Sequence, residues 1–212
     1  MPSPRNPHAV IIAGPNGAGK STLAPSLLVG ELEVGTFVNA DVIAQGLAGF
    51  DPASAAIQAG RIVLERLDGL RRAGADFAFE TTLSGLSLQR TIHDLHDSGD
   101  STDLFYLWLP DPEMAVNRVR QRVRLGGHSV PEEDIRRRYF RSIRNFDMVY
   151  RRIVSRWWLY QAFRPLELPE PPLIAKGTGE SIMEIRDAQA WEQIQIQSAE
   201  GERRGRDSGA QP

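Results

Sequence analysis

The stretch His8-Ala-Val-Ile-Ile-Ala-Gly-Pro-Asn-Gly-Ala-Gly-Lys-Ser-Thr22 decides the fold that we predict for this chain. It begins with a β-branched apolar run at residues 10–12, which is typical of a short buried strand. Gly14, Gly19, Lys20 and Ser21 then complete the pattern G-x-x-x-x-G-K-[ST]. A strand, a glycine-rich loop and a helix start in this order predict a phosphate-binding loop, or P-loop.

Each part of this loop has a physical reason. The glycines allow backbone conformations that other residues avoid, so that consecutive N–H groups can turn inward around a phosphate. A helix that begins near Lys20 points its positive end at the same phosphate. Lys20 can bridge the outer phosphates, and the Ser21 hydroxyl can bind a Mg²⁺ ion that neutralises them. The alternative, a glycine-rich turn without a ligand, is disfavoured because four specified positions rarely coincide by chance.

Length and composition predict one α/β domain. The chain has 212 residues, of which 41% are hydrophobic, and this is enough for one good core. It has no cysteine, which fits a reducing cytoplasm and excludes disulfides and thiolate metal sites. We find no signal peptide and no membrane-spanning stretch, and we expect a cytoplasmic protein. The predicted boundaries are a flexible N-terminus at 1–7, a folded domain at 8–197 and a disordered tail at 198–212.

The charge is nearly balanced overall but unevenly distributed. The formal net charge is −2, yet 12 of the 25 basic residues are arginines between positions 118 and 156. Such a segment can bind nucleic acid, but the acidic remainder of the chain argues against that partner. In a P-loop protein, an arginine-rich helical segment more often closes over a nucleotide as a lid.

Strands are predicted to alternate with helices along the chain. Expected strands after the first are 36–39, 77–79, 104–109, 157–163 and 173–175. Expected helices are 21–29, 52–72 (capped by Asp51-Pro52), 86–97, one that Asp111-Pro112 begins, one that a Ser129/Glu132 capping box begins, and 188–197. This order predicts a P-loop NTPase of the α/β class, with an open, mostly parallel sheet covered by helices on both faces.

Two acids follow predicted strands at the edge where ligands gather in such sheets. Asp41 follows a short strand, and two interpretations are open for it, a general base and a helix N-cap. The motif context favours the base. Glu80 ends the strand 77–79, where it either binds the metal ion or holds substrate hydroxyls together with Thr81 and Thr82. Asp111 is interpreted as a helix cap because prolines flank it.

The arginines at 118, 120, 122 and 124 form two pairs. Arg118 and Arg122 are four residues apart and project together, while Arg120 and Arg124 are turned away by about 160°. One pair can therefore face a polyphosphate, and the alternative is a solvated basic face. His128 lies in a glycine hinge, where it can follow a closing lid or fill a turn.

Taken together, four motifs resemble the zeta toxin family of P-loop kinases in sequence and in order. They cover most of residues 8–180 and are Gly14-Pro-Asn-Gly-Ala-Gly-Lys-Ser-Thr22, Asn39-Ala-Asp41, Phe79-Glu-Thr-Thr82 and Gly126-Gly-His-Ser-Val-Pro131, with Arg138-Tyr139 and Asn145 following.

The resemblance implies an ATP- and Mg²⁺-dependent kinase that phosphorylates a sugar hydroxyl of a UDP-N-acetyl-hexosamine, typically UDP-N-acetylglucosamine. It makes Asp41 the general base, Arg118 or Arg122 the charge-stabilising arginine, and Glu80, Thr81 and Thr82 the lining of the sugar nucleotide pocket. It also implies an antitoxin partner if the protein is a toxin. The residues implied to bind ATP are Gly14, Asn16, Gly17, Ala18, Gly19, Lys20, Ser21, Thr22 and His128.

The sequence departs from the family after Tyr160. Many relatives have a polar Asp-Asn-Ser there, whereas this chain has Gln161-Ala162-Phe163. Two other hypotheses therefore stay open. One is a kinase of another metabolite or of a nucleic-acid end, and the other is an ATP-dependent switch that catalyses nothing.

Overall fold

The computed structural model describes residues 7–25, 34–49, 54–127, 129–163 and 171–208. The strands are β1 (His8–Ala13), β2 (Phe37–Val38), β3 (Phe77–Thr81), β4 (Ser101–Trp108), β5 (Arg156–Gln161), β6 (Leu173–Thr178) and β7 (Ser181–Ile185). The helices are α1 (Lys20–Pro25), α2 (Ala40–Leu47), α3 (Ala56–Arg72), α4 (Leu88–Asp97), α5 (Pro112–Arg124), α6 (Glu132–Asn145), the π-helix η2 (Phe146–Tyr150), α7 (Arg151–Ile153) and α8 (Ala188–Ser208).

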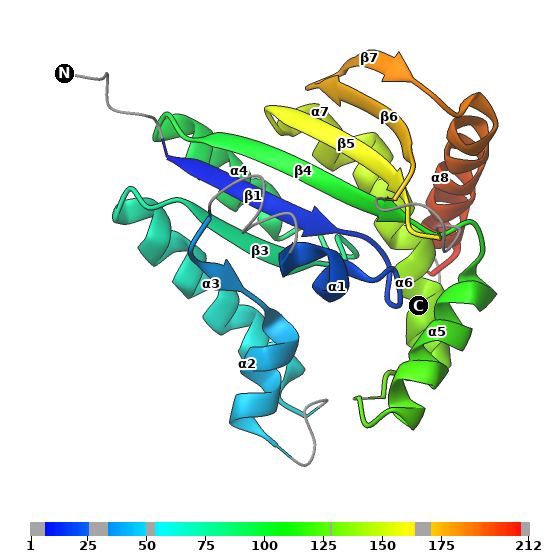
Figure 1. Cartoon of the computed structure of the whole chain (residues 1–212), viewed down its shortest axis with the longest axis horizontal. Coiled ribbons are helices and arrows are strands. Elements are labelled where there is room, and N and C mark those ends of the chain that lie inside the picture. The colour runs from blue at the N-terminus through cyan, green and yellow to red at the C-terminus, as the bar shows by residue number, and fades with distance from the viewer. Residues whose placement is uncertain (1–6, 26–33, 50–53, 128, 164–170, 209–212) are drawn as a thin grey trace.

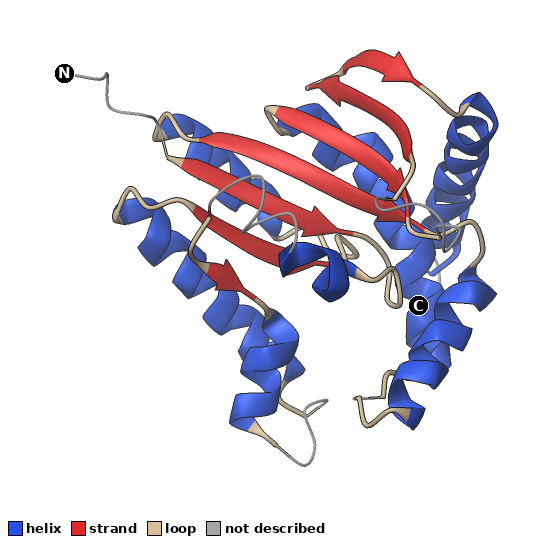
Figure 2. Ribbon diagram, viewed as in Figure 1, coloured by secondary structure: helices blue, strands red, loops and turns tan. Residues whose placement is uncertain are grey.

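The strands form one twisted sheet in the order β2-β3-β1-β4-β5-β6-β7 (Figure 1, Figure 2). The pairs β2–β3, β3–β1, β1–β4 and β4–β5 are parallel, while β5–β6 and β6–β7 are antiparallel. The predicted fold class is therefore confirmed: the sheet is mostly parallel, and its carboxyl ends meet at the edge where the P-loop follows β1.

Both faces of the sheet are covered, because side chains of β1 alternate between two clusters. Ile11 belongs to the larger cluster, which helices α3 to α6 and α8 cover. Val10 and Ile12 belong to a smaller cluster on the other face, which includes Ala24 of α1. Burial on both faces explains why the central strands have continuous apolar runs instead of alternating ones.

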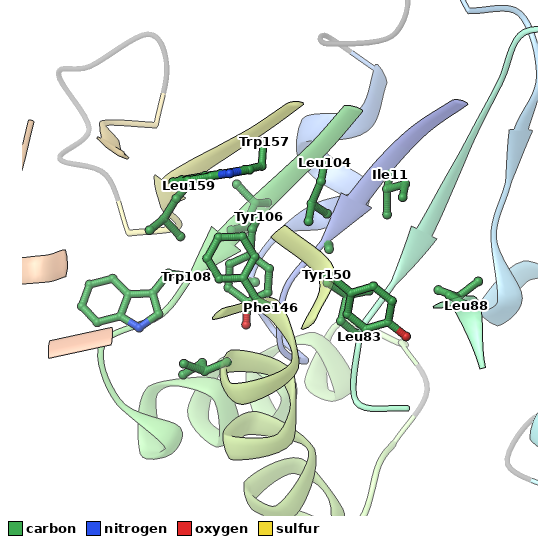
Figure 3. Packing of buried hydrophobic residues seen from close by; sticks show 14 of the residues in the cluster. Ile11, Leu83, Leu88, Leu104, Tyr106, Trp108, Phe146, Tyr150, Trp157 and Leu159 are labelled. Atoms are coloured by element: carbon green, nitrogen blue, oxygen red, sulfur yellow. The ribbon is translucent and has the colours of Figure 1, made fainter. Parts of the chain in front are cut away.

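Aromatic side chains fill the larger cluster where α6 passes into η2 (Figure 3). The rings of Tyr106 and Phe146 stack with centroids 4.3 Å apart, and Phe146 meets Trp157 edge to face at 6.0 Å. Trp157 in turn stacks on Trp191 of α8, at 6.0 Å. This packing fixes the position of η2 under the strands β4 and β5.

Several predicted boundaries are confirmed by caps. The Asp111 side chain accepts from the Glu113 amide at 2.7 Å, with Pro112 in the first turn of α5. Gly74 and Gly99 take positive φ angles of 61° and 86° directly after α3 and α4. The predicted cap Asp51-Pro52 and the end of the helix predicted at 21–29 lie outside the described residues.

Two predictions are wrong, and one strand was missed. The Ser129/Glu132 capping box does not form, because Pro131 occupies the N-cap position of α6 and makes no side-chain cap bond. Strand β7 was not expected. The tail predicted to be disordered from Ser198 is helical as far as Ser208, because α8 continues and packs on α6. Residues 1–6 and 209–212 lie outside the described residues.

Among the described residues, no helix combines the length and the apolar character needed to cross a membrane.

Candidate active site

The P-loop has the backbone conformation that its glycines allow. Gly14, Gly17 and Gly19 have φ angles of 145°, 77° and 83°. A Cβ on Gly14 would lie 2.4 Å from the Leu107 carbonyl oxygen, and one on Gly17 would lie 2.9 Å from the Ala115 carbonyl oxygen. Both the conformation and the close approach of β4 and α5 therefore require glycine at these two positions.

Lys20 begins α1 and is buried beneath the loop. Its Nζ donates to the carbonyl oxygens of Gly14 at 3.0 Å and Pro15 at 3.1 Å, and it lies 3.7 Å from Glu80 Oε1. Burial lowers the pKa of this lysine, while the carboxylates of Glu80 and Asp41 act in the opposite direction. The ammonium group is therefore held by two loop carbonyls and one carboxylate.

Glu80, near the carboxyl end of β3, lies against the P-loop. Its Oε2 accepts hydrogen bonds from Ser21 Oγ at 2.7 Å and from Asn39 Nδ2 at 3.0 Å. The adjacent strands β3 and β1 are parallel and in register, with Glu80 opposite Ile12, and this brings the carboxylate to the loop that follows β1.

Asp41 lies in the first turn of α2, and the residue that caps this helix is Asn39. The Asn39 Oδ1 accepts from the amides of Asp41 at 2.8 Å and Val42 at 3.3 Å. The N-cap interpretation of Asp41 is therefore wrong. Its exposed carboxylate is not used for capping and lies at the pocket described next.

A pocket of about 640 Å³ joins these groups. In Figure 1, α2 and α5 extend away from the sheet in the same direction, and residues of both helices line the pocket. The wall that the P-loop, β3 and α2 contribute includes Asn16, Gly17, Lys20, Asn39, Asp41, Glu80, Thr81 and Thr82; the remaining wall includes Ile57, Gly60, Arg61, Leu64, Leu88, Arg122, Val130, Asp134 and Arg138.

Asn16 is a buried polar residue of this wall, with only 9% of its surface exposed. Its Oδ1 has no hydrogen-bond partner among the described residues. A buried acceptor without a partner costs free energy unless a ligand or water satisfies it. The P-loop side of the pocket therefore has unused capacity to bind a polar ligand.

Arg118 and Arg122, which were predicted to project together, face different surroundings. Arg122 lines the pocket, and its charge contributes to the lowered pKa of Lys20. Arg118 lies behind the P-loop, where its Nη1 donates to the carbonyl oxygens of Gly17 at 3.2 Å and Ala162 at 3.4 Å. Burial lowers the pKa of Arg118. On the other side of α5, Arg120 pairs with Glu132 at 2.5 Å.

Other site residues were missed or lie outside the description. Arg61 and Arg138 line the pocket, and no role was predicted for either, although Arg138 belongs to the quoted motifs. No sequence signal distinguished Arg61 or Gly60 from the other residues of a surface helix. His128 lies outside the described residues.

The residues that could hold a metal ion are few. Among the described residues, no three His, Cys, Asp or Glu side chains gather as a metal site. Ser21 and Glu80 nevertheless place a hydroxyl and a carboxylate 2.7 Å apart beside the P-loop. This oxygen donor set fits Mg²⁺, which is usually held by one or two protein ligands, phosphates and water.

The sequence profile of a family described as an AAA domain matches residues 10–141, which contain the P-loop, Asp41, Glu80 and Arg122. The chain belongs to this family. An uncharacterized protein of Haemophilus influenzae is 30% identical to this AAA-domain chain over 131 residues, which are 62% of the chain and 91% of that protein.

Two solved structures share this fold. One is the AvrRxo1-ORF1:AvrRxo1-ORF2 complex with ATP, at a TM-score of 0.63 and 18% identity; the match covers 90% of this chain and 64% of that one. The other belongs to the PezAT chromosomal toxin-antitoxin system of Streptococcus pneumoniae, at a TM-score of 0.61 and 16% identity; the match covers 99% of this chain and 90% of that one. At these identities, the likeness shows the fold alone.

Proposed function

We propose that this protein is a kinase that transfers the γ-phosphate of ATP to a sugar hydroxyl of a UDP-N-acetyl-hexosamine, with UDP-N-acetylglucosamine as the first candidate. The observation that carries the proposal is the pocket, because the P-loop lysine and the exposed Asp41 carboxylate line the same cavity. The motif resemblance to zeta toxins supports the acceptor class, and the ATP named for the AvrRxo1-ORF1 complex supports the donor.

The P-loop would hold the ATP phosphates. In this proposal the glycine-rich loop from Asn16 to Lys20 supplies backbone N–H groups, and Lys20 exchanges its loop carbonyls for phosphate oxygens. Ser21 and Glu80 are the residues that would hold Mg²⁺, which supplies charge neutralisation at the phosphates. We thus assign Glu80 to the metal ion first, and to the acceptor only through its neighbours Thr81 and Thr82.

Asp41 is the proposed general base. It accepts the proton of the attacking sugar hydroxyl while the oxygen forms its bond to the γ-phosphorus and ADP leaves. Arg122 faces the same cavity and is the proposed cation for charge on the transferred group. Arg118 is the less favoured candidate for this cation, because its guanidinium contacts the Gly17 and Ala162 carbonyls.

The far wall of the pocket fits an anionic acceptor. Arg61 on α3 and Arg138 on α6 both line it, and no ion pair joins either of them to a described carboxylate. Two arginines that face one cavity are suited to a diphosphate. Thr81 and Thr82 add hydroxyl groups that can bind sugar hydroxyls.

The biological setting remains part of the proposal. The toxin-antitoxin system named for PezAT supports a protein antitoxin as partner, and we propose that the protein acts in the cytoplasm. If it is a toxin, we expect its expression to slow bacterial growth and the Lys20→Ala variant not to do so.

The test is an incubation of the protein with ATP, Mg²⁺ and a panel of UDP-sugars, with products analysed by mass spectrometry. We expect a UDP-amino sugar heavier by one phosphate, and no such product with the Lys20→Ala variant. Phosphorylation of another metabolite or of an RNA 5′ end instead would support the alternative kinase. ATP binding without any transfer would favour the switch.

A further inference from the structure

The loop between β3 and α4 contains a strained residue. Leu83 has a φ angle of 53°, and it is the only non-glycine residue with positive φ in the part of the chain that the structure describes. The left-handed conformation is strained for such a residue because its Cβ approaches the following carbonyl oxygen. Its side chain is buried in the larger core cluster, so the surrounding structure holds this conformation.

Two buried polar side chains bind the loop from the core side. Asn145 Nδ2 donates to the carbonyl oxygen of Leu83 at 2.8 Å and lies 3.5 Å from that of Gly85. The Tyr150 hydroxyl donates to the Gly85 carbonyl oxygen at 2.8 Å. Burial raises the pKa of Tyr150 to about 12, so this hydroxyl stays protonated at neutral pH. Figure 3 shows Tyr150 and Leu83 in the larger core cluster.

The π-helix explains how both side chains reach one loop. Residues five apart in an α-helix point about 140° away from each other, so Asn145 and Tyr150 would face different surroundings. In η2, the Arg151 amide donates to the Phe146 carbonyl, five residues back instead of four. The wider turn brings Asn145 and Tyr150 to the same side, and π-turns of this kind occur often at functional sites.

The loop they hold is a wall of the pocket. Thr82 and Ser87 of this loop line the cavity, as does Thr81 just before it, whereas Asn145 and Tyr150 do not. Thr81 Oγ1 accepts from the Leu83 amide at 3.1 Å, and the hydroxyls of Thr82 and Ser84 lie 2.9 Å apart. The Thr81 hydroxyl is therefore bonded to the Leu83 backbone, and the Thr82 hydroxyl is bonded to Ser84, which lies between the two carbonyl groups that are held.

We propose that Asn145 and Tyr150 are positioning residues for the acceptor. By fixing the carbonyl groups of Leu83 and Gly85, they keep the Thr81 and Thr82 hydroxyls directed at the acceptor without touching it. The inference rests on the proposed function, because that proposal assigns the acceptor to this pocket.

The kinetic test compares Tyr150→Phe with a matched control, Tyr139→Phe. Tyr139 also has a buried hydroxyl that donates to a loop carbonyl, that of Leu109 at 2.7 Å, but Leu109 does not line the pocket. Both variants lose one such bond, so we expect a similar loss of stability. For Tyr150→Phe we expect KM for UDP-N-acetylglucosamine to rise about tenfold while KM for ATP stays unchanged. For Tyr139→Phe we expect no rise in the acceptor KM relative to the KM for ATP. Asn145→Ala should act in the same direction as Tyr150→Phe.

Hydrogen exchange gives a second measurement that needs no substrate. Amides of residues 82–87 should exchange faster in Tyr150→Phe than in the wild type or Tyr139→Phe. An unchanged acceptor KM, or equal changes in both KM values, would overturn the positioning role. If the wild-type protein phosphorylates no UDP-sugar, the proposed function fails, and exchange alone decides whether the two side chains hold the pocket wall.

Discussion

Gly60 is a residue whose place in the pocket conflicts with the stability of its helix. It lies within α3 and lines the cavity, and nothing lies within 4 Å of the Cβ that another residue would have there. Glycine inside a helix costs about 1 kcal/mol relative to alanine. Since packing does not require glycine at this position, we infer that the bound acceptor occupies the space beside it.

We expect Gly60→Ala to raise the free energy of unfolding by up to about 1 kcal/mol and to raise KM for the acceptor, because the new methyl group enters the pocket. Gly60→Leu should raise that KM further. Urea denaturation and steady-state kinetics measure the two effects.

Gly69 offers the control for this pair of effects. It belongs to the same helix and also has open space around its Cβ position, but it does not line the pocket. Gly69→Ala should therefore stabilise the protein without changing KM. If Gly60→Ala behaves in the same way as Gly69→Ala, the acceptor does not approach Gly60.

At the level of elements, α8 is the part that the sequence described least well. Its second half contains Gly201, Gly205 and many charged residues, which weaken both helix propensity and apolar periodicity. Packing on α6 supplies the stability: Gly201 is buried against the Phe140 carbonyl, and the Arg204 guanidinium lies 4.2 Å from the centre of the Phe140 ring.

We expect Gly201→Ala to destabilise the protein by about 1–3 kcal/mol, because its Cβ would lie 2.6 Å from the Phe140 carbonyl oxygen. Gly205→Ala meets no atom within 4 Å and should be neutral or stabilising. Thermal unfolding of both variants checks this. Equal and negligible effects would mean that this segment is not docked on α6.

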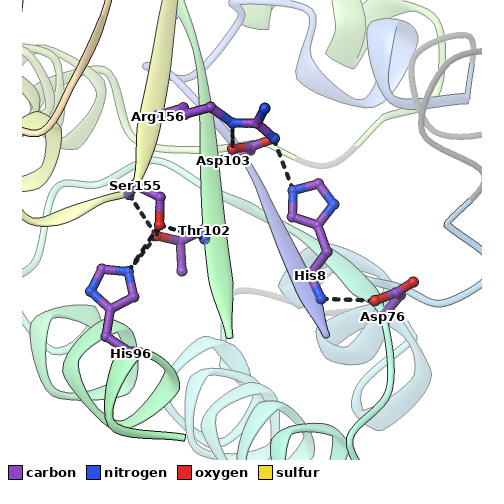
Figure 4. Close-up of polar contacts among 7 residues, drawn as sticks. All are labelled: His8, Asp76, His96, Thr102, Asp103, Ser155 and Arg156. Atoms are coloured by element: carbon purple, nitrogen blue, oxygen red, sulfur yellow. Dashed lines mark hydrogen bonds and ion pairs between the residues drawn. The ribbon is translucent and has the colours of Figure 1, made fainter. Parts of the chain in front are cut away.

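At the scale of the whole molecule, one end of the sheet forms the candidate site and the other end contains stabilising polar contacts. The pocket lies at the carboxyl ends of the central strands, and a polar cluster around the buried Asp103 lies at their amino ends (Figure 4). There Asp103 of β4 lies 2.8 Å from His8 Nε2 of β1 and accepts two hydrogen bonds from Arg156 of β5, at 2.7 and 2.6 Å. This cluster ties three adjacent strands together.

We expect Asp103→Asn to lower the free energy of unfolding at pH 7 by about 2 kcal/mol or more without changing the proposed phosphate transfer. Burial alone would raise the pKa of Asp103, but the hydrogen bonds from His8 and Arg156 outweigh it and hold the pKa below its usual value. Because the folded-state pKa is lowered, this stabilisation is present above the unfolded-state pKa of about 4 and is lost as the pH falls below it. Urea denaturation between pH 7 and pH 3 should show that the free energy of unfolding falls less for the variant than for the wild type. An equal fall in both proteins would contradict this role of Asp103.

Short sequence motifs predicted those features of the fold that depend on residues close together in the chain. The spacing of Gly14, Gly19 and Lys20 was sufficient for the P-loop, and strands alternating with helices were sufficient for the parallel part of the sheet. The bond between Ser21 and Glu80 joins residues 59 positions apart, so the sequence left the role of Glu80 open. Strand β7, the docking of α8 and the turn of Arg118 toward Gly17 depend on tertiary contacts, which no local pattern records.

The most direct measurement of the proposed chemistry is the single-turnover transfer of phosphate from ATP to UDP-N-acetylglucosamine by the Asp41→Asn variant, together with its affinity for ATP. Asn keeps the size of the side chain and removes the base, so we expect transfer to fall by about 100-fold or more while the Kd for ATP stays within about threefold of the wild-type value. Transfer at the wild-type rate would contradict the assignment of Asp41 as the base.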